Sequence, residues 1–295
     1  KIGMHIAIYN RVFEEEDIIL FRHLFQLFEK YKITAVVYSD LVARLSPVMT
    51  LPENIEHFSE MQPLHSKVSF LFSMGGDGTM LDIVQYIGNK NIPILGINLG
   101  RLGFLASTSA DQIEFAVTSL LAGNYILDPR TLLHLDASIP LFSDAPFALN
   151  EFSLHRKDSS SLIKIHTYLN GEFLCTYWAD GLIVSTPTGS TGYSLSCGGP
   201  IIFPQANSFV ITPVAPHNLN VRPLVVADNS IVSFDVEGRA EHFLCTLDAR
   251  STSIDSHVSL AVKKEDFIIN LIRLEGQNFL TTLQTKLYWG VDRRN

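Results

Sequence analysis

The segment Ser73-Met74-Gly75-Gly76-Asp77-Gly78-Thr79 follows directly on the apolar run Val68-Ser69-Phe70-Leu71-Phe72. An apolar β-type run that breaks into glycine predicts a strand that ends in a tight turn. Glycine lets a ligand come close to the main chain, and backbone N–H groups at the start of a following helix suit phosphate oxygens. The segment therefore predicts a strand, a turn and a helix, with a phosphate site at the turn as one interpretation.

Asp77 is unexpected inside such a turn, because its carboxylate would repel the phosphates that the turn attracts. One interpretation is that Asp77 takes a proton from an attacking hydroxyl or helps to hold a metal. The other is an ordinary strand–turn–helix connection in which Asp77 is the helix N-cap. The residues of the turn alone leave both interpretations open.

The first part of the chain alternates between short apolar runs and amphipathic helical patterns. Strands are expected at 6–9, 34–38, 68–72 and 94–98, and helices at 14–28, 80–87 and 113–123. This alternation predicts a mostly parallel, doubly wound α/β sheet. Residues 39–66 contain three prolines and show no clear periodicity.

From residue 130 to about residue 267 the sequence consists of short β-rich runs separated by Gly, Asn, Pro and Ser. Asn170-Gly171 between two such runs is a strong hairpin signal. We expect an antiparallel β domain here. The expected division is an α/β nucleotide-binding domain at 1–125 and a β-rich domain at 126–274, with the tail 275–295 packing back on the first domain.

Composition limits the partners. The chain has 295 residues, 22 basic and 30 acidic, and a net charge of −8, which argues against nucleic acid or an anionic membrane as the main partner. Its three cysteines have no CxxC spacing and are typical of reduced thiols. No apolar run approaches the roughly 18–20 residues that span a bilayer, and no signal-peptide pattern is recognisable. We expect a cytoplasmic protein.

The stretch 180–200 is rich in Ser, Thr and Gly, and residues 185–199 carry no charged side chain. Small donors and acceptors on a backbone that can lie close to a ligand suit sugar hydroxyls, carboxamides and phosphates. The alternative is an ordinary polar loop of a β domain.

Three acidic or amide side chains elsewhere are further candidates. Asn150 and Glu151 can grip vicinal hydroxyls, the amide donating and the carboxylate accepting, although a turn into a strand explains the pair equally simply. Asp248 is either a site carboxylate or a turn residue. The GxxxxGK[ST] pattern is absent from 88–103 and GxGxxG does not follow the first strand, which disfavours a P-loop and ordinary Rossmann dinucleotide binding.

Taken together, these segments resemble the NAD kinase family, whose members phosphorylate the 2′-hydroxyl of the adenosine ribose of NAD. Glycine turns of this kind also occur in diacylglycerol kinases, sphingosine kinases and phosphofructokinases, whereas the 180–200 stretch is specific to NAD kinases. The resemblance implies an α/β domain followed by a β-sandwich-like antiparallel domain, with the active site in the cleft between them. The matching segments are 75–79, 96–105, 150–151, 180–200, 212–219 and 222–224.

The resemblance also implies roles for particular residues. Asp77 would be the general base that deprotonates the ribose hydroxyl, and Tyr193 would stack on a base of NAD. Mg²⁺ would arrive with ATP, without a protein ligand that we can assign. The ATP-phosphate residues would be Gly75, Gly76, Gly78 and Thr79. The NAD-binding residues would be Asp77, Gly78, Asn150, Glu151, Asp180, Thr188, Thr191, Gly192, Tyr193, Ser194, Leu195 and Ser196.

The chain departs from the family pattern in two places. Cys197 stands where alanine is usual, and Asp248-Ala249-Arg250 replaces Asp-Gly followed by a polar residue. Arg250 is therefore a candidate for an added phosphate contact at the NAD site. The partners implied are the small molecules NAD and ATP, and the family is usually dimeric or tetrameric. The alternative functions are a diacylglycerol-type lipid kinase and a non-catalytic NAD sensor.

Overall fold

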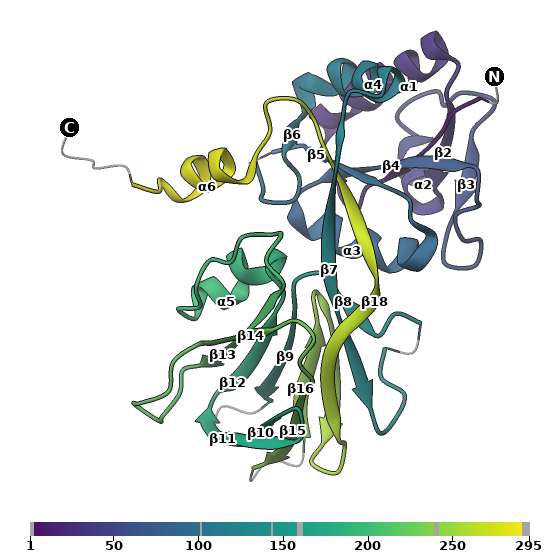
Figure 1. Cartoon of the computed structure of the whole chain (residues 1–295). Helices are drawn as coiled ribbons and strands as arrows, with labels where there is room; N and C mark the ends of the chain where they lie inside the picture. The colour runs from purple at the N-terminus through teal and green to yellow at the C-terminus, as the bar shows by residue number, and fades with distance from the viewer. Residues whose placement is uncertain (1–2, 101, 143, 158–161, 239–241, 291–295) are drawn as a thin grey trace. The chain divides into compact units, whose positions relative to one another are not determined.

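The computed structural model describes residues 3–100, 102–142, 144–157, 162–238 and 242–290 (Figure 1). The chain forms two compact units, one of residues 1–129 and 269–295 and the other of residues 130–268. The strands β7 (Ile126–Ala137) and β18 (Leu260–Arg273) both continue through a division between the units. The sequence predicts domain boundaries after residues 125 and 274. These positions lie just before the first residue of β7 and just after the last residue of β18.

The first unit contains a parallel sheet in the order β5-β4-β1-β2-β3. The chain runs from β1 outward to β2 and β3, and then returns to place β4 on the other side of β1. The doubly wound α/β prediction is confirmed. The strands are β1 (His5–Tyr9), β2 (Thr34–Tyr38), β3 (Glu56–Phe58), β4 (Val68–Gly75) and β5 (Ile94–Asn98), with β6 (Thr108–Ser109) and the end of β18 also beside β5.

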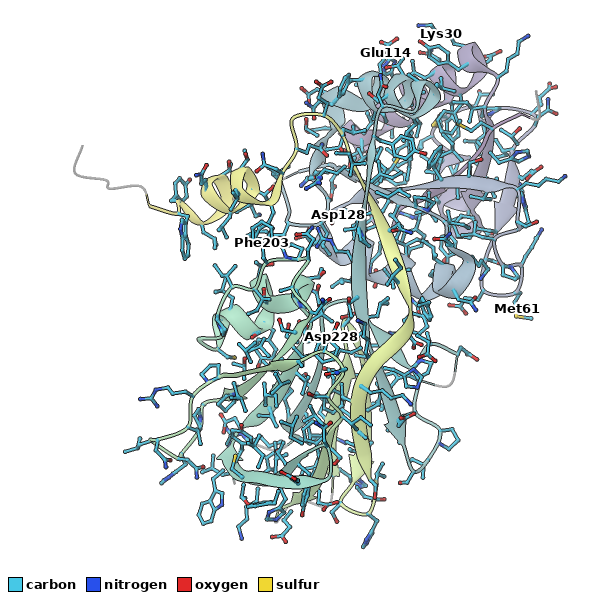
Figure 2. The ribbon with its side chains drawn as sticks, viewed as in Figure 1. Lys30, Met61, Glu114, Asp128, Phe203 and Asp228 are labelled. Carbon is cyan, nitrogen blue, oxygen red and sulfur yellow. The ribbon has the colours of Figure 1, made fainter. Side chains whose placement is uncertain are left out.

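Helices cover both faces of this sheet. The helices α1 (Ile18–Tyr31), α2 (Ser39–Leu45) and α4 (Ile113–Ala122) contribute buried side chains to one core cluster. The buried side chains of α3 (Asp77–Ile87) lie outside this cluster, on the other face of the sheet. Lys30 and Glu114 form an ion pair of 3.0 Å between α1 and α4 (Figure 2). The apolar face of α1 packs into the core as its spacing predicts, through Phe21, Leu24, Phe25 and Phe28.

The tail of the chain begins against the first unit. The side-chain amide of Gln277 donates to the carbonyl of Ser107 and to the Thr108 hydroxyl, at 3.2 and 3.0 Å. The Phe279 ring lies 6.3 Å from the Phe104 ring. The following helix, α6 (Phe279–Leu287), buries only Leu283 among its described residues.

The second unit is built from antiparallel strands, as expected. One sheet has the order β14-β13-β12-β9-β16-β17, and the other part contains β11, β10, β15 and β18, with β7 and β8 alongside β18. The stacked rings of Phe152 and Phe234, 5.4 Å apart, join the two in a common core. The bounds are β8 (Phe147–Ala148), β9 (Glu151–Arg156), β10 (Ile163–Leu169), β11 (Glu172–Ala179), β12 (Gly181–Ser185), β13 (Ser208–Val214), β14 (Leu224–Ala227), β15 (Val232–Glu237), β16 (His242–Leu247) and β17 (Arg250–Asp255).

Local sequence explains the main turns of this unit. Asn170 and Gly171 connect β10 to β11 with positive φ values of 52° and 83°, which is the geometry that favours Asn-Gly in a hairpin. Helical structure in its described residues is confined to η4 (Thr188–Thr191) and α5 (Tyr193–Ser196). None of the described helices of the chain has both the length and the apolar character needed to cross a membrane.

Candidate active site

The glycine turn at the end of β4 lines a cavity of about 470 Å³ in the first unit. The four residues expected to bind ATP phosphates, Gly75, Gly76, Gly78 and Thr79, all contribute to its wall. The helix α3 starts at Asp77 with Gly76 in the N-cap position, so the interpretation of Asp77 as an N-cap is wrong. The turn thus leads into the N-terminus of a helix, where N–H groups and the helix dipole favour an anion.

The carboxylate of Asp77 accepts three backbone hydrogen bonds from a single loop. Its Oδ2 accepts from the N–H of Phe104 at 2.8 Å, and its Oδ1 accepts from those of Leu105 and Ala106 at 2.9 and 3.0 Å. A carboxylate has about four acceptor positions, so Oδ2 retains capacity for one more donor. Asp77 is therefore held in a fixed orientation by the loop that follows β5.

Gly103 makes this arrangement possible. A Cβ atom on residue 103 would lie 1.9 Å from Oδ1 of Asp77, far inside van der Waals contact. The sequence pattern identified Gly103 as part of a motif, but it gave no indication that the motif wraps the Asp77 carboxylate. The partners are separated from Asp77 by 27 to 29 positions.

A second carboxylate in the other unit has an equivalent set of bonds. Asp248 accepts from the N–H groups of Leu149, Asn150 and Glu151 at 2.8, 2.8 and 3.1 Å. Burial raises the pKa of Asp248 even though these three bonds act in the opposite direction. Asp248 is the turn residue between β16 and β17, with φ of 51°, and it anchors the segment that carries Asn150 and Glu151.

Asn150 and Glu151 present buried atoms without protein partners. Oδ1 of Asn150 and Oε2 of Glu151 are buried and have no hydrogen-bond partner within the part of the chain that the structure describes. Burial, followed by the nearby charge of Asp248, raises the pKa of Glu151 to about 8. Because buried polar atoms are nearly always satisfied, these two atoms indicate a place for a polar ligand.

The glycines of the 180–200 stretch pack against this pair. A Cβ on Gly189 would lie 2.2 Å from the carbonyl oxygen of Asn150, and one on Gly192 would lie 3.5 Å from Oε2 of Glu151. Thr186 also donates from its hydroxyl to the carbonyl oxygen of Leu149, at 2.6 Å. The structure therefore brings Asn150, Glu151 and the first half of this stretch together.

Other residues expected at the NAD site have varied surroundings. The ring of Tyr193 is 41% exposed and stacks on His155 at 5.5 Å, and Asp180 pairs with Arg156 at 3.0 Å. Thr188 is buried and accepts from Arg130 at 3.2 Å. The buried hydroxyl of Ser194 bonds to the Thr212 hydroxyl at 2.8 Å, which is a structural contact. Thr191, Gly192 and Leu195 are half-buried, and Ser196 is exposed.

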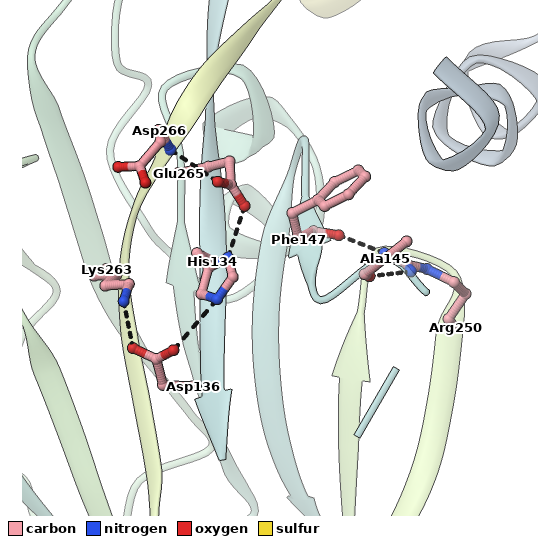
Figure 3. A network of polar contacts seen from close by, with 8 residues as sticks. All are labelled: His134, Asp136, Ala145, Phe147, Arg250, Lys263, Glu265 and Asp266. Carbon is pink, nitrogen blue, oxygen red and sulfur yellow. Dashed lines mark hydrogen bonds and ion pairs between the residues drawn. The ribbon is translucent and has the colours of Figure 1, made fainter. Parts of the chain in front are cut away.

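Arg250 contacts the protein backbone. Its guanidinium donates to the carbonyl oxygens of Ala145 and Phe147 (Figure 3). It also lies over the Phe142 ring, 5.6 Å from the ring centroid. These contacts give Arg250 a structural role at the start of β17, which competes with the phosphate contact that we expected.

Several functional candidates were not evident from the sequence. A His-Arg pair such as His155-Arg156 is more often a surface feature than a ligand, yet these two residues contact Tyr193 and Asp180. The alternation of β9 is the signal that could have placed His155 on the same face as Glu151. Groups of three or more His, Cys, Asp or Glu side chains that could hold a metal are absent from the described residues.

Comparison with known proteins identifies the relatives of the chain. The model of the ATP-NAD kinase N-terminal domain matches residues 24–125, and that of the ATP-NAD kinase C-terminal domain matches residues 149–274. The chain is 48% identical to an NAD kinase of Cytophaga hutchinsonii and 45% identical to one of Flavobacterium psychrophilum. Both alignments cover 99% of this chain and 100% of the relative.

Two solved structures have the same fold. The yeast NADH kinase complexed with NADH has a TM-score of 0.87 at 21% identity, covering 98% of this chain and 89% of that one. An NAD kinase from Archaeoglobus fulgidus in complex with ATP has a TM-score of 0.74 at 23% identity, covering 97% and 99%. With the full-length sequence similarity and the two domain matches, the conclusion is that this chain belongs to the NAD kinase family.

Proposed function

We propose that this enzyme transfers the γ-phosphate of ATP directly to the 2′-hydroxyl of the adenosine ribose of NAD, with Asp77 as the general base. The observation that carries the proposal is the similarity to NAD kinases over 99% of the chain, which includes both the glycine turn and the 180–200 stretch. The complexes with ATP and NADH of the two structural relatives agree with these ligand classes.

The triphosphate of ATP would bind at the glycine turn. Gly75, Gly76, Gly78 and Thr79 line one cavity at the start of α3, so their backbone offers close approach and donors to phosphate oxygens. Positioning and charge stabilisation are the main requirements of phosphoryl transfer, and both are supplied by a rigid turn at a helix N-terminus.

Asp77 would receive the proton of the attacking hydroxyl. Support comes from the remaining acceptor capacity of Oδ2 and from the three loop bonds that fix the carboxylate before substrate arrives. A fixed base avoids reorganisation when the proton moves. In this assignment the 104–106 loop positions the base and Asp77 performs the chemistry.

NAD would bind at Asn150, Glu151 and the 180–200 stretch. The buried Oδ1 of Asn150 and Oε2 of Glu151 would accept hydrogen bonds from ribose hydroxyls, which would satisfy both atoms. Tyr193 offers a partly exposed ring for stacking on a base, since its other face is supported by His155.

In the proposed reaction, Mg²⁺ enters the active site bound to ATP. Mg²⁺ keeps several of its waters and takes few protein ligands when it binds with substrate phosphates, so ATP and water would supply most of its ligands. Its contribution would be to offset the charge of the triphosphate. Action in the cytoplasm and assembly into dimers or tetramers are further parts of the proposal, and light scattering of the purified protein tests the assembly.

The decisive assay is coupled NADP⁺ formation from NAD with ATP, other triphosphates or polyphosphate, with and without Mg²⁺. We expect NADP⁺ and ADP in equal amounts, dependent on Mg²⁺. NAD binding without NADP⁺ formation would instead support a sensor, and phosphorylation of diacylglycerol would support a lipid kinase. The full-length match to NAD kinases disfavours both of these alternatives.

A further inference from the structure

Arg11 follows β1 and lines the same 470 Å³ cavity as the glycine turn. The cavity lies at the carboxyl ends of β1 and β4, neighbouring strands from which the chain leaves toward opposite sides of the sheet. In doubly wound folds, ligands bind at such a point because the loops after the two strands separate there. Arg11 therefore occupies a ligand-binding position that the glycine motif does not include.

A hydrogen bond connects the loop that carries Arg11 to the end of β4, where the glycine turn begins. The neighbouring residue, Asn10, is fully buried, and its Nδ2 donates to the carbonyl oxygens of Met74 and Val12 at 2.7 and 2.9 Å. The carbonyl oxygen of Asn10 accepts from Arg44 at 2.7 Å. These bonds hold the backbone of residue 11 beside the end of β4.

The charges of the residues that line the cavity indicate that Arg11 is needed to attract an anion. Among the described lining residues the charged ones are Arg11, Glu14 and Asp17, so Arg11 is the only cation of that set. The whole chain carries a net charge of −8, which opposes the approach of an anion. A triphosphate bound at the turn consequently depends on local positive charge.

Asp82 orients the guanidinium of Arg11. Nη1 of Arg11 donates to Oδ2 of Asp82 at 3.1 Å, and the side chains of Arg11 and Asp82 are 61% and 16% exposed. Asp82 lies on α3 one turn after Gly78, so the pair connects the end of β1 to the helix that the glycine turn begins. An exposed pair of this kind adds little to stability, whereas a guanidinium has five N–H donors and can bind Asp82 and a phosphate together.

We propose that Arg11 binds the triphosphate of the phosphoryl donor and that Asp82 is the positioning residue for Arg11. The inference rests on the proposed kinase activity and adds a donor-binding residue to it. The Arg11 guanidinium supplies charge-assisted hydrogen bonds to phosphate oxygens, in addition to the backbone N–H groups of the glycine turn.

The test compares Arg11→Ala, Arg11→Lys and the wild type, with Arg22→Ala as control. Arg22 is an exposed arginine of the same unit that lines a different cavity. We expect Arg11→Ala to raise the KM for ATP about tenfold or more, since a charge-assisted bond is lost, with the KM for NAD nearly unchanged. Arg11→Lys recovers part of the loss, and Arg22→Ala behaves as the wild type.

Inorganic tripolyphosphate, used as an inhibitor that competes with ATP, tests whether Arg11 binds the phosphates of ATP and not its nucleoside. Arg11→Ala is expected to raise its inhibition constant by the same factor as the KM for ATP. Raising the KCl concentration should weaken ATP binding more in the wild type than in Arg11→Ala, because the salt-sensitive contact is already absent from the variant.

Asp82→Asn tests the positioning role. We expect a smaller rise in the KM for ATP, about threefold, with kcat retained and the KM recovered in Asp82→Glu. An unchanged KM for ATP in Arg11→Ala, or an equal rise in the KM for both substrates, overturns the inference while wild-type NADP⁺ formation keeps the proposed function intact. A wild type that makes no NADP⁺ from ATP and NAD overturns the proposed function itself.

Discussion

Asp77 in the first unit and Asp248 in the second are held by the same device. Each carboxylate accepts hydrogen bonds from three consecutive backbone N–H groups, at 2.8 to 3.0 Å for Asp77 and at 2.8 to 3.1 Å for Asp248. The surroundings differ. Asp77 opens a helix beside a cavity, whereas Asp248 occupies a hairpin turn where burial raises its pKa. The same local geometry can therefore position a reactive group or shape a binding segment, and the presence or absence of a cavity beside the carboxylate determines which.

The largest expected effect is that of Asp77→Asn. The amide is a poor base and directs N–H donors at a loop that itself donates, so kcat should fall by about a hundredfold or more. Steady-state NADP⁺ formation measures kcat, and titration calorimetry with NAD measures binding. A variant with a near-normal kcat would remove Asp77 from the chemistry.

Asp248→Asn should affect binding more than turnover. Loss of the carboxylate leaves the N–H groups of Leu149, Asn150 and Glu151 without a full set of hydrogen bonds. The segment that carries the buried Oδ1 of Asn150 and Oε2 of Glu151 then becomes less rigid. We expect the KM for NAD to rise about tenfold, together with a lower Tm. An unchanged KM for NAD would show that the anchor does not serve the NAD site.

Two glycine substitutions sharpen the contrast. In Gly103→Ala the new Cβ would meet Oδ1 of Asp77 at 1.9 Å, and in Gly189→Ala it would meet the carbonyl oxygen of Asn150 at 2.2 Å. We expect the first to lower kcat about tenfold and the second to raise mainly the KM for NAD.

Gly3→Ala is the control for the first substitution, because a Cβ there would meet only the carbonyl oxygen of Lys32, at an ordinary distance of 3.8 Å, and residue 3 does not line the cavity at the glycine turn. Its kinetic constants should stay within about twofold of the wild type. Equal effects of Gly3→Ala and Gly103→Ala would exclude the contact with Asp77 as the cause.

The smallest effect concerns pH and stability. The folded-state pKa of Glu151 is about 8, above its ordinary value of 4.5, so the folded protein binds a proton that the unfolded chain has released. The contribution of Glu151 to stability is therefore greatest at low pH and is lost as pH rises from about 4.5 through about 8.

Thermal unfolding between pH 5.5 and pH 8.5, with and without Glu151→Gln, measures this contribution. We expect the Tm of the wild type to fall by a few degrees more than that of the variant over this range. Parallel pH profiles for the two proteins would contradict the raised pKa.

Much of the fold could be predicted because its signals are local. The apolar runs at 6–9, 34–38 and 94–98 correspond to β1, β2 and β5, and Asn170-Gly171 forms the expected hairpin turn. Residues 39–66 could not be interpreted, since α2 is short and β3 has only three residues among the prolines.

The site was only partly predictable, because its decisive contacts are distant in sequence. Asp77 and Asp248 were recognised as candidates, but their partners lie 27 to 29 and 97 to 99 positions away. The position of Arg11 depends on the order of strands in the sheet, which a single sequence pattern does not specify. Motifs identified the residue types, and tertiary structure assigned their contacts.

The different roles of Asp77 and Asp248 can be measured in one experiment, the rate of NADP⁺ formation at saturating NAD and ATP by the wild type, Asp77→Asn and Asp248→Asn. Saturation removes the binding defect of Asp248→Asn and leaves the chemical defect of Asp77→Asn. We expect Asp248→Asn to recover to within a few fold of the wild-type rate, whereas Asp77→Asn stays about a hundredfold or more below it. Recovery of Asp77→Asn to the wild-type rate would show that Asp77 is not the general base.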